Sequence, residues 1–483
     1  MLNPALLTAL GNILPAAAIL TAAEDTRPYE CDGLTLFRTQ PGAVVLPETE
    51  AQVVAIMKLC HAARLPVVAR GAGTGLSGGA LPHRDGLTLS LAKFQRILAI
   101  DPLACTATVQ PGVRNLAISQ AAAPYGLFYA PDPSSQIACT IGGNVAENSG
   151  GVHCLKYGLT VHNVRRVRAV LVTGEVIELG SGALDASGYD LLALMCGSEG
   201  LLGVITEVTV KLTPKPQEAT CVLAAFDDLA NAGKAVAAII GAGIVPAGLE
   251  MMDRLTIRAV EPFVHAGYPD ADAILLCESD GVPAEVTEEV ALVERLMAEA
   301  GATLIQVSKS EEQRARFWSG RKSAFPAAGR ISPDYYCSDG TIPRRALAPV
   351  LKRIAALSAE FGLPCMNVFH AGDGNLHPLI LYDANRPGDA EKTQAFGGKI
   401  LELCVEVGGT ITGEHGVGVE KIGDMCMQFA PAELERFHGV KRAFDPEGLL
   451  NPGKAVPTLH RCAEMGRMHV HRGALPHPEL PRF

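Results

Sequence analysis

The chain has 483 residues, 48% of them hydrophobic, and a formal net charge of −10 at pH 7, which describes a globular protein of two or three domains. The acidic balance excludes nucleic acid as the main partner, because phosphate backbones bind basic surfaces. The 13 cysteines include no Cys-x-x-Cys pair, so we expect neither a zinc ribbon nor an iron–sulfur cluster, and a cytoplasmic protein with reduced thiols.

The first 39 residues are expected to form an N-terminal docking segment. Leu6 to Leu20 is apolar, but Gly11, Asn12 and Pro15 interrupt it and no basic residue precedes it. This pattern fits neither a signal peptide nor a membrane span. We therefore expect a docking helix here.

A strand, a helix and a second strand come next and lead into a glycine-rich loop. Hydrophobic spacing predicts strands at 43–46 and 65–69 and a helix at 48–63. The loop at 70–79 does not match the nicotinamide fingerprint, because its third glycine is misplaced and no acidic ribose ligand follows about twenty positions later. Its backbone N–H groups can instead cradle a pyrophosphate, and the alternative is a flexible surface loop.

Two further glycine-rich runs, at 131–151 and 197–206, favour the cofactor interpretation. The second of them leads into a predicted strand at 207–212. Three such loops in the first half of the chain suggest one large phosphate-bearing cofactor threaded between them. The residues expected to bind it are Arg70, Gly71, Gly73, Thr74, Gly75, Leu76, Ser77, Gly78, Gly79, Pro131, Asp132, Ser135, Thr140, Gly142, Gly143, Asn144, Ser149, Gly150, Gly200, Gly203, Val204 and Ile205.

The second half of the chain is expected to form a separate domain of mixed helices and strands. Lys215 lies between prolines at 214 and 216 and marks the predicted boundary. Beyond it the patterns predict strands such as 273–276 and helices such as 283–300. The predicted domains are therefore 40–215 for the cofactor and 216–456 for the substrate.

The remaining residues, 457–483, form a tail with four histidines and four prolines. Its composition suggests either a metal-binding tract or an arm that covers a partner.

The candidate chemistry lies in two short histidine-rich clusters. In the first, apolar runs flank Gly-Asp-Gly-Asn at 372–375, which predicts a hairpin that pairs His370 with His377. Opposed strand residues hold their Cβ atoms about 5 Å apart, close enough for two imidazoles to share one metal ion. The alternative is that these histidines are satisfied core or turn residues.

The second cluster, Glu414 and His415, can supply a third metal ligand and a base. Successive strand residues point to opposite faces, so Glu414 is assigned to the metal and His415 is left free to accept a proton. Two histidines and one carboxylate leave coordination positions open, as in a catalytic site, and suit Zn²⁺, Mn²⁺ or Fe²⁺.

Together these motifs resemble a known family. Residues 40–215 are similar to the flavin-binding domain of the vanillyl-alcohol oxidase and p-cresol methylhydroxylase superfamily, and residues 216–456 to its FAD-linked oxidase C-terminal domain. The histidine clusters, with Trp318 to Lys322 and Leu450 to Lys454, resemble the branch that oxidises D-2-hydroxy acids, and most of all the catalytic flavin subunits of bacterial glycolate oxidases. The resemblance implies an α+β fold, a PCMH-type FAD-binding domain with a cap domain, FAD as cofactor, and Asn451 as a further cofactor-binding residue.

The same resemblance implies flavin-dependent oxidation of a small 2-hydroxy acid. Arg321 can bind a carboxylate in a bidentate manner and is implied as the substrate arginine, the alternative being a structural salt bridge. Hydride is expected to pass to FAD, and electrons to a companion flavin subunit and an iron–sulfur subunit at the membrane. Relatives specific for 2-hydroxyglutarate have asparagine at the position of Leu379 and a lysine near Tyr335, so glycolate or D-lactate is the expected substrate here.

Three rival functions are considered. One is a D-2-hydroxyglutarate or D-lactate dehydrogenase of the same family. A non-catalytic flavin subunit that relays electrons would not need the histidine and glutamate clusters, and a metal hydrolase would not need three cofactor loops. The presence of both features favours the dehydrogenase.

Overall fold

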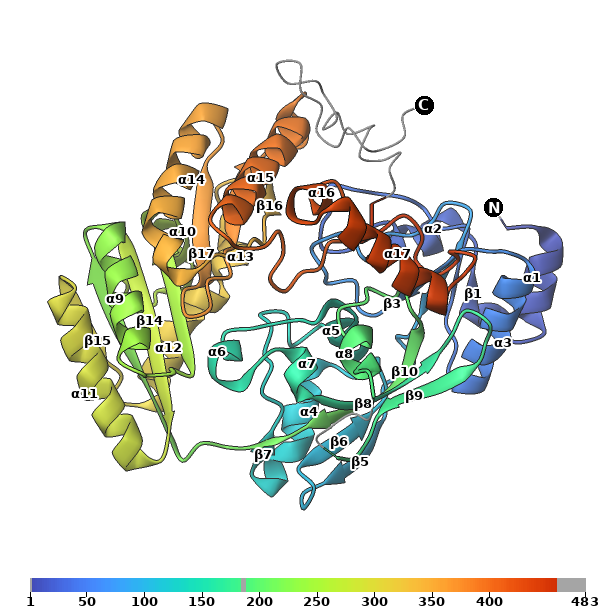
Figure 1. Cartoon of the computed structure of the whole chain (residues 1–483), viewed down its shortest axis with the longest axis horizontal. Coiled ribbons are helices and arrows are strands. Elements are labelled where there is room, and N and C mark those ends of the chain that lie inside the picture. Colours follow the sequence, from blue (N-terminus) through green and yellow to red (C-terminus); the bar gives the residue numbers. More distant parts are fainter. Residues whose placement is uncertain (1, 184–187, 458–483) are drawn as a thin grey trace.

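The computed structural model describes residues 2–183 and 188–457, so the predicted tail lies outside the described residues except for its first residue. Within them the strands form sheets of four, five, two and seven strands. The three smaller sheets belong to the first half of the chain and are called the N-terminal body below. The seven-stranded sheet and its helices are called the cap (Figure 1).

Two sheets dominate the N-terminal body. In the four-stranded sheet, β2, β3 and β4 are parallel and β1 pairs with β2 in the antiparallel sense. The five-stranded sheet is antiparallel, in the order β5-β6-β10-β8-β9. The elements are α1 (Pro4–Gly11), β1 (Ile19–Leu20), α2 (Ala23–Thr26), β2 (Ala43–Val45), α3 (Glu50–Ala62), β3 (Val67–Arg70), β4 (Leu87–Ser90), β5 (Ile97–Asp101), β6 (Thr106–Val109), α4 (Asn115–Ala122), β7 (Leu127–Phe128), α5 (Ile141–Glu147), α6 (Cys154–Tyr157), α7 (Thr160–Asn163), β8 (Val164–Val170), β9 (Val176–Gly180), α8 (Leu191–Met195), β10 (Val204–Lys211) and β11 (Thr213–Pro214).

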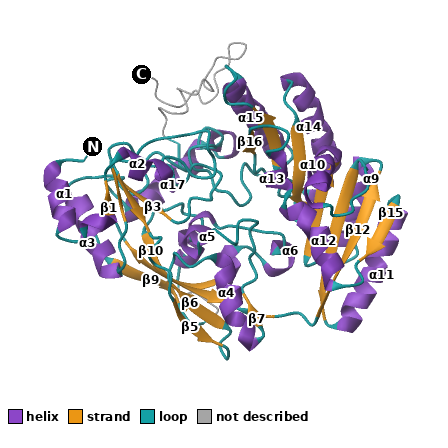
Figure 2. Ribbon diagram, turned by 180° about the vertical axis from the view of Figure 1, so that it is seen from behind, coloured by secondary structure: helices purple, strands orange, loops and turns teal. Residues whose placement is uncertain are grey.

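The cap is one antiparallel sheet in the order β15-β12-β14-β13-β17-β18-β16, with helices on both faces (Figure 2). Along β12, Val222 and Ala224 pack on the face covered by α9, α11, α14 and α15, whereas Leu223 and Ala225 pack on the face covered by α10, α12 and α13. The elements are β12 (Glu218–Phe226), α9 (Leu229–Gly241), β13 (Gly248–Asp253), α10 (Arg254–Val264), β14 (Ala273–Gly281), α11 (Pro283–Glu299), β15 (Leu304–Val307), α12 (Glu311–Lys322), α13 (Ala324–Ala328), β16 (Asp334–Cys337), α14 (Leu347–Phe361), β17 (Cys365–His370), β18 (Pro378–Tyr382) and α15 (Asp389–Glu406).

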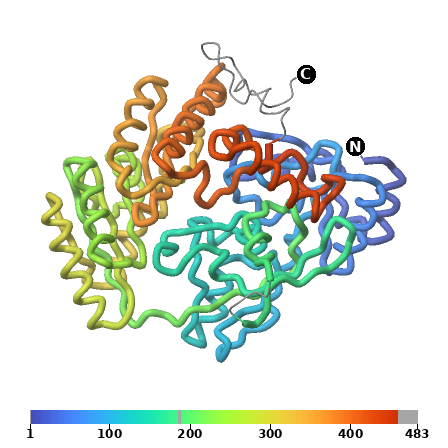
Figure 3. The backbone as a smooth tube through the Cα atoms, viewed as in Figure 1, coloured from blue at the N-terminus to red at the C-terminus, as the bar shows by residue number. Residues whose placement is uncertain are grey.

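The last described segment returns from the cap to the N-terminal body. Helices α16 (Met425–Gln428) and α17 (Pro431–Phe444) follow the cap, and α17 lies over the N-terminal body, as the red tube in Figure 3 shows. Leu450 then forms a parallel bridge with Val67 of β3. Residues near both ends of the chain therefore build the same sheet edge.

Most of the predicted elements are confirmed with small shifts at their ends: the helix at 48–63 is α3, the helix at 283–300 is α11, and the predicted strands are β2, β3, β10 and β14. The single docking helix predicted within 6–20 is wrong. Helix α1 ends at Gly11, Pro15 prevents its continuation, and Ile19 and Leu20 instead pair with β2. Leu10 and Leu14 are buried in the core of the N-terminal body. Within the described residues, no helix is both long and apolar enough to cross a membrane.

A partly buried ion-pair network joins the two bodies at helix α6. His153 Nδ1 lies 2.7 Å from Asp132 Oδ2 of the N-terminal body, and its Nε2 lies 3.3 Å from Glu278 Oε1 on cap strand β14. One turn later Lys156 Nζ lies 2.6 Å from Asp280 Oδ1 on the same strand. Burial by itself disfavours the imidazolium, but Asp132 and Glu278 outweigh it and raise the pKa of His153 to about 10.

This network predicts a pH-dependent contribution to stability. Because the folded pKa of His153 lies above its ordinary value of about 6.5, the stabilisation is complete below that pH and is lost as the pH rises toward about 10. The thermal midpoint of His153→Gln should therefore lie below that of the wild type at pH about 6, and the gap should shrink on the way to pH about 10. A gap that stays constant across this range, or an equal gap for the control His83→Gln in a loop of the N-terminal body, would contradict the assignment.

Candidate active site

One cavity of about 530 Å³ brings the glycine-rich loops and the histidine clusters together. Residues of the three loops form one part of its wall, and cap residues including Arg321, His370, His377 and His415 form another. The volume lies in the range of cofactor and substrate sites. A cofactor held by the loops would therefore share a space with the candidate catalytic residues.

Most of the predicted cofactor-binding residues line this cavity: Arg70, Gly71, Gly73, Thr74, Gly75, Leu76, Gly79, Ser135, Thr140, Gly142, Gly143, Asn144, Ser149, Gly200, Gly203 and Ile205. Absent side chains let the loops approach one another. A Cβ on Gly142 would lie 2.5 Å from Pro111 Cβ, and Gly73 has a φ of +71°, which favours glycine. The narrow, glycine-lined channel suits a pyrophosphate-bearing cofactor.

The other predicted cofactor-binding residues lie behind the cavity wall: Ser77, Gly78, Pro131, Asp132, Gly150, Val204 and Asn451. Several of them hold the loops in place. The carbonyl of Ser77 accepts the N–H groups of Val419 and Glu420 at 3.0 and 3.1 Å. Asn451 Nδ2 donates to the carbonyls of Gly79 and Glu199 at 2.9 and 2.6 Å, which ties the first and third loops together. These residues therefore shape the cavity without lining it.

Sequence reasoning missed two acidic residues in the cavity wall, Glu147 and Glu199. The carboxylate of Glu199 accepts the N–H groups of Val417 and Gly418, both at 2.7 Å, so it also anchors the segment after the second histidine cluster. Burial, together with the charge of Glu199, raises the pKa of Glu147 well above its ordinary value. Both lie within the glycine-rich runs, but an acidic side chain is not an expected partner for a phosphate.

The aromatic cap residues in the wall, Phe325 and Tyr335, were also missed as cavity residues. Phe325 lies in α13 and Tyr335 in β16. From sequence alone, an aromatic residue in a helix or strand that lines a cavity looks the same as one that packs in the core. Their rings stand edge to face with centroids 5.8 Å apart. They give this part of the cavity an apolar wall.

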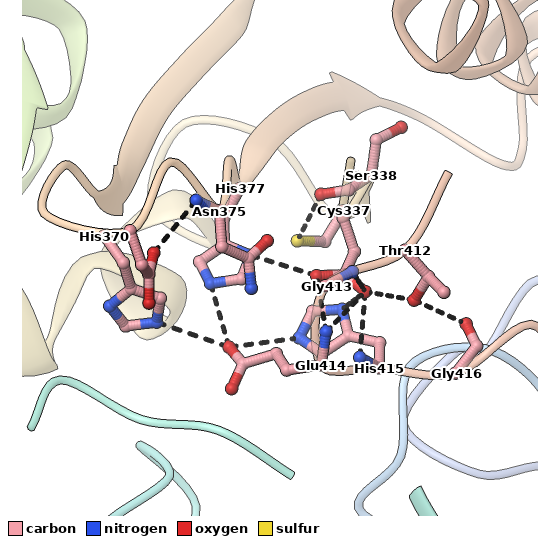
Figure 4. A network of polar contacts seen from close by, with 12 residues as sticks. Cys337, Ser338, His370, Asn375, His377, Thr412, Gly413, Glu414, His415 and Gly416 are labelled. Atoms are coloured by element: carbon pink, nitrogen blue, oxygen red, sulfur yellow. Dashed lines mark hydrogen bonds and ion pairs between the residues drawn. The ribbon is translucent and has the colours of Figure 1, made fainter. Parts of the chain in front are cut away.

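The structure brings the three predicted metal ligands together. Glu414 Oε1 lies 3.3 Å from His370 Nε2 and 3.0 Å from His377 Nε2, and the two imidazole centroids are 5.0 Å apart (Figure 4). One ligand atom from each of the three residues lies within 4.8 Å of the ligand atoms of the other two. Two imidazole nitrogens and a carboxylate oxygen that converge in this way fit a divalent metal with open positions for a substrate.

The predicted register of the hairpin is wrong. His370 is paired with Asn375 and not with His377, because residues 371–374 form the turn and the N–H of Gly374 donates to the carbonyl of His370. The observed register differs from the predicted one by two residues, which leaves each side chain on its predicted face. His377 thus reaches the ring of His370 as a diagonal neighbour, which is close enough for long and aromatic side chains.

The predicted strand alternation, which would turn Glu414 and His415 to opposite faces, is also wrong. Residues 411–416 form no strand; the N–H groups of Gly413, Glu414 and His415 all donate to the carboxylate of Asp339. His415 stacks on His377 with centroids 5.1 Å apart and an interplanar angle of 14°. Its Nε2 lies 3.9 Å from Glu414 Oε1, so both side chains face the same cluster.

A buried carboxylate, Glu250 on β13, connects the predicted substrate arginine to the histidines. Its two oxygens lie 2.6 Å from Arg321 Nε and 2.6 Å from His370 Nδ1. Burial alone would raise the pKa of Glu250, but the charges of His370 and Arg321 hold it below its usual range. A carboxylate on Nδ1 orients an imidazole so that Nε2 can bind a metal.

The charges of the cluster distinguish Glu414 from His415. Although burial opposes it, hydrogen bonds from His370 and His377 hold the pKa of Glu414 well below its usual value. Burial is the main cause that lowers the pKa of His415 to about 4. Glu414 is therefore an anion, as a carboxylate that binds a metal must be, and His415 is a neutral imidazole that can accept a proton.

Comparisons with known proteins agree with this geometry. Residues 41–180 match the family described as FAD binding domain, and residues 215–455 match the family described as FAD linked oxidases, C-terminal domain. The structure is similar to that of p-cresol methylhydroxylase with substrate bound, with a TM-score of 0.80 at 19% identity over 94% of this chain and 97% of that chain. The predicted fold class, a PCMH-type FAD-binding domain with a cap domain, is confirmed.

Curated relatives extend over nearly the whole chain. It is 63% identical to "Glycolate oxidase subunit GlcD" of Escherichia coli strain K12 over 478 residues, which cover 99% of this chain and 96% of the relative. It is 39% identical to the protein of the same name from Bacillus subtilis strain 168, over 88% of this chain and 91% of the relative. It is 33% identical to "D-lactate dehydrogenase" of Anaerostipes hadrus, over 90% of this chain and 94% of the relative.

The cavity geometry predicts that Gly143→Leu prevents flavin binding. Gly143 lies in helix α5 and lines the cavity, and only Thr140 Oγ1, at 3.3 Å, lies near the position of its missing Cβ. A leucine would thus fill cofactor space while keeping helical backbone angles. The purified variant should show native circular dichroism without flavin absorbance. Gly439→Leu, in α17 with open space around it, is the control and should keep its flavin; a fully loaded Gly143→Leu would contradict the placement.

Proposed function

The chain belongs to the family of FAD-linked oxidases, as an FAD-dependent oxidoreductase, and on this premise we propose that it oxidises a small 2-hydroxy acid, glycolate above all, to the 2-oxo acid. The observation that carries the proposal is the single cavity shared by the glycine-rich loops, Arg321 and the histidine cluster. The names of the relatives, glycolate oxidase subunit and D-lactate dehydrogenase, support the same class of substrate.

In this proposal each polar residue of the cap has a separate task. Arg321 binds the substrate carboxylate through the part of its guanidinium that faces the cavity, while Nε stays bound to Glu250. His370, His377 and Glu414 hold a divalent ion, Zn²⁺, Mn²⁺ or Fe²⁺. A bound ion would lower the pKa of the substrate hydroxyl, as metals do for water.

His415 accepts the hydroxyl proton. Its neutral ring lines the cavity, and its stacking on His377 keeps it in one orientation beside the ligands. FAD, when bound, supplies the hydride acceptor. In this proposal the protein supplies Arg321 to bind the substrate carboxylate, His415 as the base, and the cavity that holds substrate and cofactor together.

The cavity wall favours a short substrate, as predicted, but Leu379 is not the residue responsible. Leu379 is fully buried between β16 and β17 and does not line the cavity, so it cannot select the substrate by direct contact. The apolar rings of Phe325 and Tyr335 occupy the wall near Arg321 instead. Neither carries a positive charge for a second carboxylate, and the hydroxyl of Tyr335 is the one hydrogen-bond donor that these two side chains supply. The exposed Lys322, which also lines the cavity, is a cation on which a dicarboxylate could depend.

A catalytic subunit of this kind needs an outlet for electrons. No cysteine run in the chain can hold an iron–sulfur cluster. We propose that electrons leave through a companion flavin subunit and an iron–sulfur subunit, in line with the word subunit in the names of two relatives. Affinity purification from cells that express all three should recover them together, and deletion of residues 458–483 should reduce the recovery. A solitary protein that reduces quinone at full rate would refute this.

The test of the proposed reaction is anaerobic reduction of the bound flavin. Glycolate and D-lactate should bleach its visible absorbance, and D-2-hydroxyglutarate should do so poorly, because Phe325 and Tyr335 give its second carboxylate no positive charge to pair with. Lys322→Ala is the control for the dicarboxylate and should leave the rate with glycolate unchanged. A kcat/KM for D-2-hydroxyglutarate that equals that for glycolate would overturn the substrate assignment, and no bleaching by any 2-hydroxy acid would overturn the function.

Separate tasks for the ligands and the base predict separate phenotypes. His370→Asn, His377→Asn and Glu414→Gln should each lose metal and activity together. His415→Asn should keep flavin and most of the metal, and its flavin reduction should slow by roughly 10²–10⁴-fold, the usual worth of a general base. The metal content and the rate of anaerobic flavin reduction, measured for all four variants, test this division between ligands and base. Equal metal loss in His415→Asn would show the division to be wrong, and full activity after complete chelation would exclude a catalytic metal.

A further inference from the structure

A second set of ligand atoms lies on the opposite edge of the stacked His377 and His415 rings. The Nε2 atoms of both rings face Glu414, whereas their Nδ1 atoms each lie 3.9 Å from the carboxylate of Asp339. The thiol of Cys337, at the end of β16, projects toward the same edge (Figure 4). Ligand atoms of Cys337, His377 and His415 fall within 4.8 Å of one another.

These atoms lack the partners that buried polar groups normally have. The Nδ1 atoms of His377 and His415 are buried and have no hydrogen-bond partner among the described residues. Nearly all buried polar side-chain atoms in folded proteins are paired, so two unpaired nitrogens on one edge call for an explanation. The Cys337 thiol makes a hydrogen bond of 3.4 Å to the carbonyl of Ser338, which a metal-bound thiolate can give up.

We propose that Cys337, His377 and His415 form a second metal position, distinct from the one made by His370, His377 and Glu414, and that it binds soft divalent ions such as Zn²⁺ and Cd²⁺. One sulfur and two imidazole nitrogens suit Zn²⁺, and the Asp339 carboxylate stands beside both nitrogens as a fourth donor for tetrahedral geometry. A thiolate does not suit Mn²⁺, which prefers oxygen and nitrogen ligands. The two positions therefore differ in selectivity.

Binding at this position balances in charge and protons. The Cys337 thiol loses its proton to solvent when the ion binds, as metal-coordinated thiols do. The thiolate and Asp339 then carry two negative charges against the two positive charges of the ion. Lys421, whose Nζ lies 3.8 Å from Asp339 Oδ2, remains paired with Glu420 at 2.9 Å.

Occupation of the second position removes the proposed base, a consequence that rests on the proposed function. An ion on His415 Nδ1 leaves Nε2 as the N–H nitrogen, so the ring can no longer accept a proton. His377 belongs to both sets, so an ion at one position also competes for the ring that the other needs. Excess Zn²⁺ should therefore inhibit the enzyme.

The direct test is X-ray absorption at the cadmium edge on the flavin-loaded protein with Cd²⁺ added in excess. The wild type should show one sulfur neighbour together with nitrogen neighbours. Cys337→Ser should lose the sulfur neighbour, and Cys365→Ser, at a buried thiol in β17, which β18 separates from β16, should keep it. If Cd²⁺ in the wild type has only nitrogen and oxygen neighbours, the proposed site is wrong, whatever the variants show. A sulfur neighbour that persists in Cys337→Ser would also overturn the proposal.

The second test is inhibition of flavin reduction by added Zn²⁺. For each variant, the rate with Zn²⁺ is compared with the rate of the same variant in buffer without added metal. Cys337→Ser should need at least roughly 10–100-fold more Zn²⁺ for half-inhibition than the wild type, since even an outer-shell partner of a metal is worth that much affinity. Equal sensitivity of Cys337→Ser and the wild type would overturn the inhibitory role. If no 2-hydroxy acid reduces the flavin, the proposed function fails, and the cadmium experiment still decides the metal position.

Discussion

The active site depends on one buried carboxylate, Asp339. It has no exposed side-chain surface, and an unpaired charge at such a depth would be costly. The N–H groups of Gly413, Glu414 and His415 and the hydroxyl of Thr412 donate to it. These bonds hold an irregular loop against the end of β16 and so determine where Glu414 and His415 lie.

A second buried carboxylate, Glu250, positions the other part of the site, Arg321 and His370. It lies on the central cap strand β13 and joins Arg321 of α12 to His370 of β17. The proposed anchor for a substrate carboxylate and the first of the proposed metal ligands are thus held by one anion. The apolar layers on both faces of the cap sheet bury this anion, and burial strengthens its interaction with both cations.

The proposed function requires the two bodies to meet in one arrangement, because the glycine-rich loops come from one body and the proposed catalytic residues from the other. Three contacts secure this. His153 and Lys156 bind the cap strand β14, Glu199 binds the backbone after the second histidine cluster, and Asn451 ties two cofactor loops to the returning chain. Glu199 and Asn451 are buried, where a hydrogen bond is worth more than at the surface, whereas the side chain of Lys156 is 30% exposed.

The sequence by itself determined the parts: the glycine-rich loops, the residues His370, His377, Glu414 and His415, and most helices and strands. Glycine runs and hydrophobic spacing are local signals, and local backbone preference decides them. Only the tertiary structure decided the pairing of His370 with Asn375 and the roles of Glu250 and Asp339. Glu250 lies 120 positions from His370, and Asp339 lies 76 from His415. No local pattern encodes such contacts, since strand register and the neighbours of a buried charge follow from how distant segments pack.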